Sequence, residues 1–456
     1  MHRSTVRRAL LTCAALALLA ACSKSYSSLP STSPTPVPSG SPGAIGTPSV
    51  ASVGVAYVPD GGGAGQRGVE VVHFEDTSGN LLAKPAPVAV VFPGAVEELA
   101  ISSDTTVGIG AMSRAAAAPY PLIQDLSGFT GASPVLVGPA YDAAIVPSPA
   151  PNATPTAAAV IPDIAGVAVL GTGQQSVGLA VGGTNGILAT SALTNSSFPF
   201  AYGGFASFMP ASGSTVTVPA GTRNNITASP LSPTTGTFTV LVRGQDLLVY
   251  DVTQNLSGSG YLFTITAEDA TLGTTPSLLR GNGAMALTSD GSRAVLAQAQ
   301  GPDTVALITG LPTAIKVAAT LTLPSRPHSV AISPNGAYAA VGTDGGVFLV
   351  SGVSGSTLAM TGPLVATYTG SDGLSHQLVN VSSVGFTLDG RYLVALALLN
   401  PGVSTVGSVV VLPFNQSAAP GSPTPSPAPT GSPLPTMFVQ SGITTGGIDL
   451  DNLVVR

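Results

Sequence analysis

The chain carries little charge and no tryptophan. Only 8% of its 456 residues are Asp, Glu, Lys or Arg, whereas an ordinary soluble domain has about 25%. A chain so poor in charged side chains is unsuited to long helices with solvated faces. Only three residues are lysine, so no basic stripe is available for phosphates, and we expect no nucleic-acid partner.

Cysteine is also scarce. The two cysteines are Cys13 and Cys22, both close to the N-terminus, so disulfide bonds are not expected to hold the fold together. Glycine and proline are abundant instead, with 55 and 40 residues, and 44% of the chain is hydrophobic. Turn-forming residues between runs of Val, Ala, Ile and Thr are typical of many short strands. The composition therefore predicts an all-β protein.

The first 21 residues have the pattern of a secretory signal. Arg3, Arg7 and Arg8 precede an apolar run over residues 9–21, which is too short to span a bilayer as a helix. We expect residues 1–21 to be removed. The remaining chain then has 12 basic and 21 acidic residues and a net charge of −9.

The signal ends in a sequence that resembles the lipobox of bacterial lipoproteins. The residues are Leu19, Ala20, Ala21 and Cys22. The resemblance implies that Cys22 is acylated and becomes the N-terminus, which anchors the protein to a membrane through its acyl chains. The other interpretation is an ordinary secretory signal that happens to contain a cysteine.

Residues 22–50 are rich in Ser, Pro and Thr, a composition typical of a disordered tether. It would hold the folded part, residues 51–456, off the membrane. The predicted location is the cell envelope, lipid-anchored and extracytoplasmic, either in the periplasm or at the cell surface. Two further low-complexity tracts, near 147–157 and 415–436, are expected to form surface loops.

A strand–turn–strand unit recurs along the chain. Its clearest copies span 283–310, 326–352 and 382–414, and repeats of about 40–50 residues with four strands each are typical of propeller blades. In each copy an Asp-Gly or Asn-Gly pair predicts the hairpin turn between the first two strands. The seven predicted turn residues are Asp104, Asp163, Ser212, Asp290, Asn335, Asp389 and Asp451.

The copy "RPHSVAISPNGAYAAVGTDGG" resembles the YVTN-type repeat of bacterial seven-bladed β-propellers. The residues that match are Pro327, Val330, Ala331, Ile332, Ser333, Pro334, Asn335, Gly336, Tyr338 and Val341. The resemblance implies an all-β β-propeller with seven four-stranded blades, and six or eight blades remain open. The absence of tryptophan argues against the usual WD-repeat type.

The first strands of the blades, such as "LAIS", "MALT", "VAIS" and "VGFT", are expected to lie innermost, where small and β-branched residues pack best. We also expect the C-terminal strand to complete a blade begun by the N-terminal strands, which would close the propeller. Both "NLVV" and "VGVAYV" are candidates for the second strand of that blade.

Recognisable catalytic motifs are absent from the sequence. No HExxH, CxxC, GxSxG or Walker motif occurs, so no cofactor or metal is predicted. The letters of GxGxxG at 63–68 lie in a loop with no helix after them, where a dinucleotide would find no helix N-terminus. The acids at Asp449 and Asp451 could form a calcium loop, although paired Asp residues more often stabilise a turn.

Two residues are catalytic candidates. His328 lies at the start of one first strand, and Glu98, with its neighbour Glu97, lies at the start of another. A histidine and carboxylates that converge on a channel could polarise a water, bind a metal or hydrolyse a lactone, as in lactonase-type propellers. The alternative is that His328 is solvated or bonded to a loop carbonyl.

The sequence thus favours a membrane-tethered binding or interaction scaffold without catalytic activity. Its partner would be an unidentified protein or glycan at the propeller face, and the protein itself would be a monomer. A propeller-type hydrolase or lactonase with a site at the channel mouth is the alternative. A structural protein of the cell envelope is a third hypothesis.

Overall fold

The computed structural model describes a set of ranges within the compact unit Gly40–Arg456. These ranges are 54–60, 68–75, 81–82, 88–91, 95–102, 105, 107–113, 120–125, 137–142, 164–170, 176–182, 188–194, 201–208, 226–230, 237–243, 247–257, 260–270, 284–298, 302–365, 367–370, 372–399, 406–414, 438–444 and 453–456. The signal, the lipobox with Cys22, the tether and the two low-complexity tracts lie outside them. None of these ranges contains a helix that is long and apolar enough to cross a membrane.

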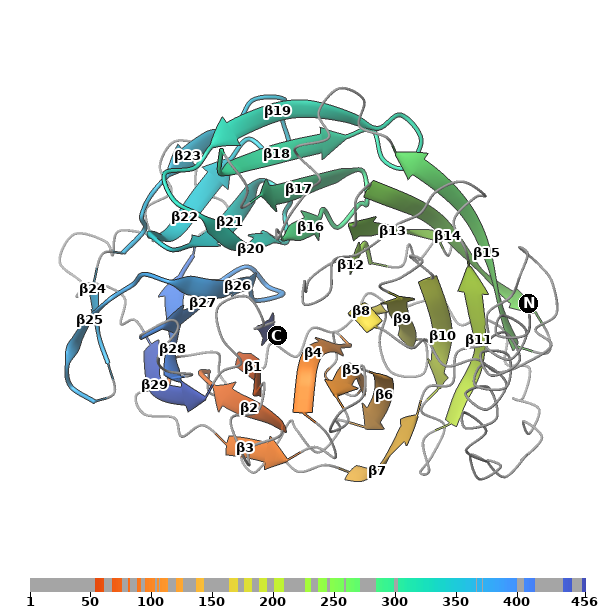
Figure 1. Cartoon of the computed structure of the whole chain (residues 1–456), viewed down its shortest axis with the longest axis horizontal. Helices are drawn as coiled ribbons and strands as arrows, with labels where there is room; N and C mark the ends of the chain where they lie inside the picture. The colour runs from red at the N-terminus through yellow and green to blue at the C-terminus, as the bar shows by residue number, and fades with distance from the viewer. Residues whose placement is uncertain are drawn as a thin grey trace, which may run out of the picture. The chain divides into compact units, whose positions relative to one another are not determined.

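The described residues form strands and no helices, so the all-β prediction is confirmed (Figure 1). The first three four-stranded sheets, with strands in sheet order, are β3 (Val88–Val91), β2 (Gly68–His73), β1 (Val55–Asp60) and β30 (Val454–Val455); β4 (Ala95–Ile101), β5 (Val107–Ser113), β6 (Tyr120–Asp125) and β7 (Val137–Asp142); and β8 (Ile164–Leu170), β9 (Ser176–Gly182), β10 (Leu188–Thr194) and β11 (Ala201–Phe208).

Four further four-stranded sheets are antiparallel, and their strands follow one another in sequence. They are β12 (Ile226–Ala228), β13 (Thr237–Arg243), β14 (Leu247–Ser257) and β15 (Gly260–Ala270); β16 (Met285–Leu287), β17 (Arg293–Gln298), β18 (Thr304–Thr309) and β19 (Lys316–Thr322); β20 (Pro327–Ile332), β21 (Tyr338–Thr343), β22 (Gly346–Ser351) and β23 (Ala359–Thr361); and β26 (Val381–Phe386), β27 (Tyr392–Leu398), β28 (Val406–Pro413) and β29 (Phe438–Thr444). This arrangement is propeller-like.

In four sheets the middle strands are buried along nearly their whole length, which explains why they are apolar at most positions. These strands are β1 and β2, β17 and β18, β21 and β22, and β27 and β28. In β27, Leu393 and Ala395 pack in a cluster with β21 and β22, whereas Val394 and Leu396 pack in a cluster with β1 and β2. Successive side chains of a strand point to opposite faces. One strand therefore contributes to two cores, each lying between neighbouring sheets.

The hairpin turns at Asp290, Asn335 and Asp389 are confirmed, and they share one hydrogen-bond network. In the first, the hydroxyl of Thr288 donates to Asp290 Oδ1 at 2.6 Å, and the backbone N–H of Ser292 donates to the same oxygen at 3.0 Å. The left-handed backbone belongs to the glycine that follows, Gly291, with φ of 69°. The Asp or Asn side chain thus holds the loop while the glycine makes the bend.

The other two turns repeat these bonds. Ser333 and Thr387 donate to Asn335 Oδ1 and Asp389 Oδ1, both at 2.7 Å. The glycines of the two turns, Gly336 and Gly390, both have φ of 70°. Because the side-chain oxygen of Asn335 accepts the same hydrogen bonds as those of the two aspartates, the turn requires this oxygen and not a negative charge.

The other four predicted turn residues, Asp104, Asp163, Ser212 and Asp451, lie outside the described residues.

The C-terminal strand pairs with the N-terminal one. β30 runs antiparallel to β1, with Ala56 opposite Val455 and Tyr57 opposite Val454. In the sheet order β3-β2-β1-β30, "VGVAYV" supplies the second strand and "NLVV" the first. In Figure 1 the C-terminus accordingly lies among the first strands of the sheets.

One element was not predicted. β24 (Thr367–Thr369) and β25 (Ser375–Gln377) form a two-stranded hairpin between β23 and β26. Tyr368 and Leu378 anchor it in the core shared by the neighbouring sheets. Leu374, in the turn between the two strands, is 62% exposed.

Candidate functional site

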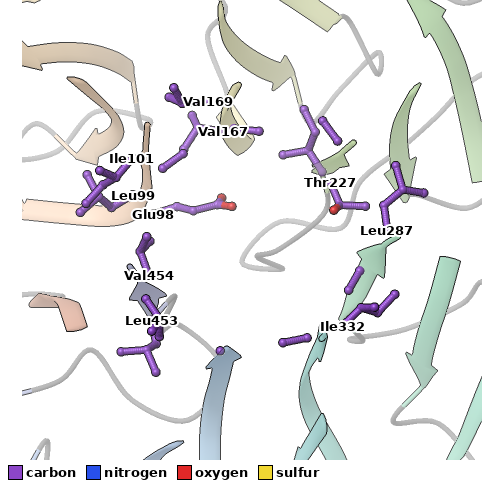
Figure 2. A pocket seen from close by; sticks show the side chains of 18 of the residues that line it. Glu98, Leu99, Ile101, Val167, Val169, Thr227, Leu287, Ile332, Leu453 and Val454 are labelled. Carbon is purple, nitrogen blue, oxygen red and sulfur yellow. The ribbon is translucent and has the colours of Figure 1, made fainter. Parts of the chain in front are cut away.

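A pocket of about 350 Å³ lies among the first strands of the seven sheets. The segments "LAIS", "MALT", "VAIS" and "VGFT" all contribute to its wall, as predicted. Its lining comprises Glu98, Leu99, Ala100, Ile101, Val167, Ala168, Val169, Leu170, Ile226, Thr227, Ala228, Met285, Ala286, Leu287, Val330, Ala331, Ile332, Val384, Gly385, Phe386, Leu453, Val454, Val455 and Arg456. Apart from Glu98, Thr227 and Arg456, these side chains are apolar, and Figure 2 shows several of them around the cavity.

Glu98 carries the one carboxylate side chain among these lining residues. It lies on β4 and is only 3% exposed, and Figure 2 shows its carboxylate directed into the pocket. A break in the β4–β5 register between Val96 and Glu98 leaves Glu97 as the extra residue of a bulge. A bulge of this kind changes the direction of the side chains that follow it.

His328 occupies the corresponding bulge position in β20, where the β20–β21 register breaks between Pro327 and Ser329. It therefore corresponds to Glu97 and not to Glu98. His328 is not one of the residues that line the pocket. Of the two catalytic candidates, only Glu98 faces this cavity.

His328 is paired with a carboxylate that the sequence did not suggest. Its Nε2 lies 2.7 Å from Oδ1 of Asp344, and the His328 side chain is 2% exposed. The backbone of Asp344 is held as well, because its N–H donates to Arg326 and its carbonyl accepts from Asn380, both at 3.0 Å. Since Nδ1 of His328 is buried too, the ring offers no solvent-facing nitrogen to a substrate.

Arg456 is the lining residue that sequence reasoning missed. Its guanidinium donates to the carbonyl oxygens of Ser102 at 3.1 Å and Val455 at 2.9 Å, and also to that of Ile101. Its backbone pairs with Val55 in both directions at 2.9 Å. No local motif marks this role, because it depends on β30 joining the N-terminal sheet.

A second histidine pair lies on the β24–β25 hairpin, where His376 Nε2 is 2.9 Å from Asp372 Oδ2. The N–H of Leu374 and the His376 ring hydrogen-bond to this carboxylate and hold the pKa of Asp372 below its usual range. Because these two residues are only four positions apart in sequence, the pair lies within one hairpin. No group of three or more His, Cys, Asp or Glu side chains that could hold a metal ion occurs among the described residues.

The comparisons with known proteins concern the fold. No family model and no curated protein sequence matches the chain. A solved structure of a proposed 6-phosphogluconolactonase from Bacteroides fragilis is 13% identical, with a TM-score of 0.51, and the match covers 89% of this chain and 99% of that one. A similar protein from Bacteroides uniformis is 12% identical, with a TM-score of 0.49, over 89% and 100% of the two chains. At such identity the Bacteroides fragilis structure supports an all-β, propeller-like class and nothing finer.

Proposed function

We propose that the chain is a bacterial lipoprotein whose YVTN-type propeller serves as a non-catalytic binding scaffold in the cell envelope. Its fold would be a closed ring of seven four-stranded blades. Support comes from the seven four-stranded sheets of the described residues, whose first strands share one pocket, and from the β30–β1 pair. Closure of this kind removes the exposed sheet edges that would otherwise pair with other chains.

The observation that carries the binding hypothesis is the chemistry of the pocket wall. Its side chains are apolar except for one carboxylate, one guanidinium and one hydroxyl, contributed by Glu98, Arg456 and Thr227. A concave, mostly apolar site with few polar groups is typical of ligand binding. The histidine that hydrolysis would require is paired with Asp344 and does not line this pocket.

The anchor is tested with Cys22→Ala. We expect the wild-type protein to fractionate with membranes and the variant to be released into the soluble extracytoplasmic fraction, because it has no acyl chain. A Cys13→Ala variant is the matched control, since residue 13 would be removed with the signal. A Cys22→Ala protein that still fractionates with lipid would contradict the lipoprotein hypothesis.

The binding role is tested by cross-linking and affinity capture of the lipid-anchored protein from its own envelope. We expect a defined protein or glycan to be captured by the folded domain, with the Cys22→Ala form added to the same envelopes as a control for the anchor. Capture of wall material through the Pro/Ser/Thr tracts alone would favour the structural envelope protein. Capture of nothing reproducible would count against the scaffold.

A lactone hydrolase is the second candidate. The observation in its favour is the 2.7 Å His328–Asp344 pair, on a fold shared with a proposed 6-phosphogluconolactonase. The buried His328 ring would have to become exposed before it could act on a substrate as a general base. The test is hydrolysis of a gluconolactone by the purified domain and by a His328→Gln variant. Turnover that disappears in the variant would favour the hydrolase over the scaffold.

A further inference from the structure

We propose that the pocket binds a neutral, hydroxyl-rich ring, such as a monosaccharide or a cyclitol, through the backbone edges of the first strands. This inference names the ligand class of the pocket and rests on the binding function proposed above. The lining consists of consecutive residues, such as Met285, Ala286 and Leu287. Because side chains alternate between the two faces of a strand, a wall made of one face would use every second residue. The pocket is therefore bordered by the edges of these strands.

The seven first strands each lie at one end of their sheet, so each has an edge that no further strand covers. In an antiparallel pair, alternate residues exchange backbone hydrogen bonds with the partner strand, and the residues between them direct their N–H and C=O groups the other way. In β16, Ala284 and Thr288 bond to β17 at 2.8 and 2.9 Å. Met285 and Leu287 therefore direct their peptide groups away from β17, on the side of the pocket that they line.

Other first strands have their peptide groups in the same phase. Ser229, Ser333 and Thr387 donate from their backbone N–H groups to the second strands at 2.9, 2.9 and 3.0 Å, and Arg456 pairs with β1 in both directions at 2.9 Å. The peptide groups one and three residues before each of them therefore face away from the second strand. These belong to Ile226, Ala228, Val330, Ile332, Val384, Phe386, Leu453 and Val455, and all eight residues line the pocket.

Side chains of the protein already bind three such peptide groups. The Arg456 guanidinium donates to the carbonyl oxygen of Val455 at 2.9 Å and to that of Ile101. Ile101 has in β4 the register position of the equivalent residues in the other sheets. The hydroxyl oxygen of Ser383 accepts from the N–H of Leu453 at 3.1 Å. The edges can therefore be recognised by hydrogen-bonding groups that do not belong to a strand.

Hydroxyl groups fit these edges better than apolar groups do. Each outward peptide group presents a donor beside an acceptor, and a hydroxyl both donates and accepts. An apolar ligand would remove the peptide groups from water without replacing their hydrogen bonds, which costs free energy. The volume of about 350 Å³ is within the range that small ligands occupy.

A net charge on the ligand brings no advantage in this pocket. Glu98 and Arg456 have opposite charges and line the same cavity. Both side chains already have interactions within the protein. The backbone edges, which are neutral, thus supply most of the hydrogen-bonding groups, and a neutral ligand satisfies them.

The test compares four neutral polyols, glucose, galactose, mannose and inositol, with three rings that have a single polar group, cyclohexanol, cyclohexylammonium and cyclohexanecarboxylate. Ligand-detected NMR titration of the purified folded protein measures each affinity. We expect at least one polyol to bind about tenfold or more tightly than cyclohexanol, because it makes several additional hydrogen bonds. No polyol tighter than cyclohexanol, or the tightest binding by a charged ring, would overturn the inference.

The edges are tested with proline, which removes a backbone N–H and is tolerated on an edge strand where that N–H makes no bond to the neighbouring strand. We expect at least one of Ala228→Pro, Leu287→Pro and Ile332→Pro to weaken binding of the tightest polyol about fivefold, the contribution of one hydrogen bond. Unchanged binding in all three would contradict recognition by the edges. If these variants do not fold, the probe series on the wild-type protein decides.

Thr320→Pro is the matched control, since Thr320 is exposed on the outer strand β19. Leu323 donates to Asp303 at 2.8 Å, so the N–H of Thr320 faces away from β18. The control should bind the polyol as the wild type does, and an equal loss would count against the inference. Absence of polyol binding with capture of an envelope partner intact would reject this inference and leave the binding scaffold in place, whereas absence of both would reject the two together.

Discussion

Arg391 donates from Nη2 to Oε1 of Glu75 at 2.9 Å, although 316 residues separate the two in sequence. The Glu75 side chain is 1% exposed and also accepts from the N–H of Gly54 at 3.2 Å. The pair joins the turn after β26 to the second residue after β2, so it links the sheet β26–β29 to the N-terminal sheet. The ionised Glu75 depends on this link, because a buried carboxylate without a cation is costly.

Arg391→Ala should lower the free energy of unfolding by about 2 kcal/mol. A fully buried pair would lose more, but the Arg391 side chain is 43% exposed. Urea denaturation of the purified domain measures this loss. Arg293→Ala is the matched control, since Arg293 donates to the carbonyl oxygens of Val353 and Gly355 and its removal leaves no buried charge. A loss at Arg293 as large as that at Arg391 would contradict the role of Glu75.

The charge of Asp389 should make stability depend on acid pH. Burial alone would raise the pKa of this carboxyl, but hydrogen bonds from Thr387 and Arg391 outweigh it and hold the pKa below its usual range. As pH falls, the carboxyl of Asp389 therefore binds a proton in the unfolded chain before it does so in the folded protein. The stability that its charge contributes is fully present above the unfolded pKa of about 4 and is lost as pH falls through the folded pKa.

Asp389→Asn keeps the oxygen that the turn needs, as Asn335 shows, and loses the charge. We expect the variant to be less stable than the wild type at neutral pH, and the difference to shrink as pH falls below about 4. Denaturation midpoints across this range measure it. A difference that stays constant with pH would show that the charge contributes nothing.

Tyr57 should make stability fall in alkali. Burial raises the pKa of its phenol to about 12, against the lowering effects of Arg456 and of a hydrogen bond with Thr105. In the unfolded chain tyrosine ionises near pH 10. The stability that Tyr57 contributes is therefore fully present below about pH 10 and is lost as pH rises toward the folded value.

Tyr57→Phe should remove this part of the alkaline loss, at most about 3 kcal/mol for a two-unit difference. Urea denaturation at successive pH values measures the stability of both proteins. The difference in phenolate absorbance between the wild type and the variant measures the ionisation of Tyr57. If the Tyr57 phenolate formed near pH 10 in the folded protein, the burial argument would be wrong.

Two glycines with positive φ should differ in what alanine costs. At Gly336, φ is 70° and a Cβ would meet only Thr288 Cγ2, at 3.8 Å. Gly336→Ala should therefore lose about 1 kcal/mol, the backbone cost alone. At Gly352, φ is 86° and a Cβ would collide with the carbonyl oxygen of Thr357. Gly352→Ala should lose clearly more, and equal midpoints of urea denaturation for the two variants would contradict this comparison.

Some elements of the fold followed directly from local sequence. Asp290-Gly291, Asn335-Gly336 and Asp389-Gly390 predicted their hairpins because a side-chain oxygen and a left-handed glycine act within a few residues. The other predicted turn residues, Asp104, Asp163, Ser212 and Asp451, lie outside the described residues.

In the candidate site, too, local sequence indicated some residues, while the pairing of others depends on distant parts of the chain. Glu98 and His328 were both found as unusual residues at the start of first strands, but only the register of the bulges shows that His328 corresponds to Glu97. The pairing of His328 with Asp344, sixteen residues away, depends on the turn between β21 and β22. The role of Arg456 depends on a strand pair between the two ends of the described chain.

The sequence by itself determined the all-β class, the repeated hairpins and the small, β-branched character of the first strands, because these depend on local turn chemistry and on the alternation of side chains along a strand. Only the tertiary structure decided which strand completes the N-terminal sheet, which acid faces the pocket and which buried charge Arg391 neutralises. Those outcomes depend on contacts between residues hundreds of positions apart, such as Glu75 and Arg391, and no local pattern in a single sequence specifies such contacts.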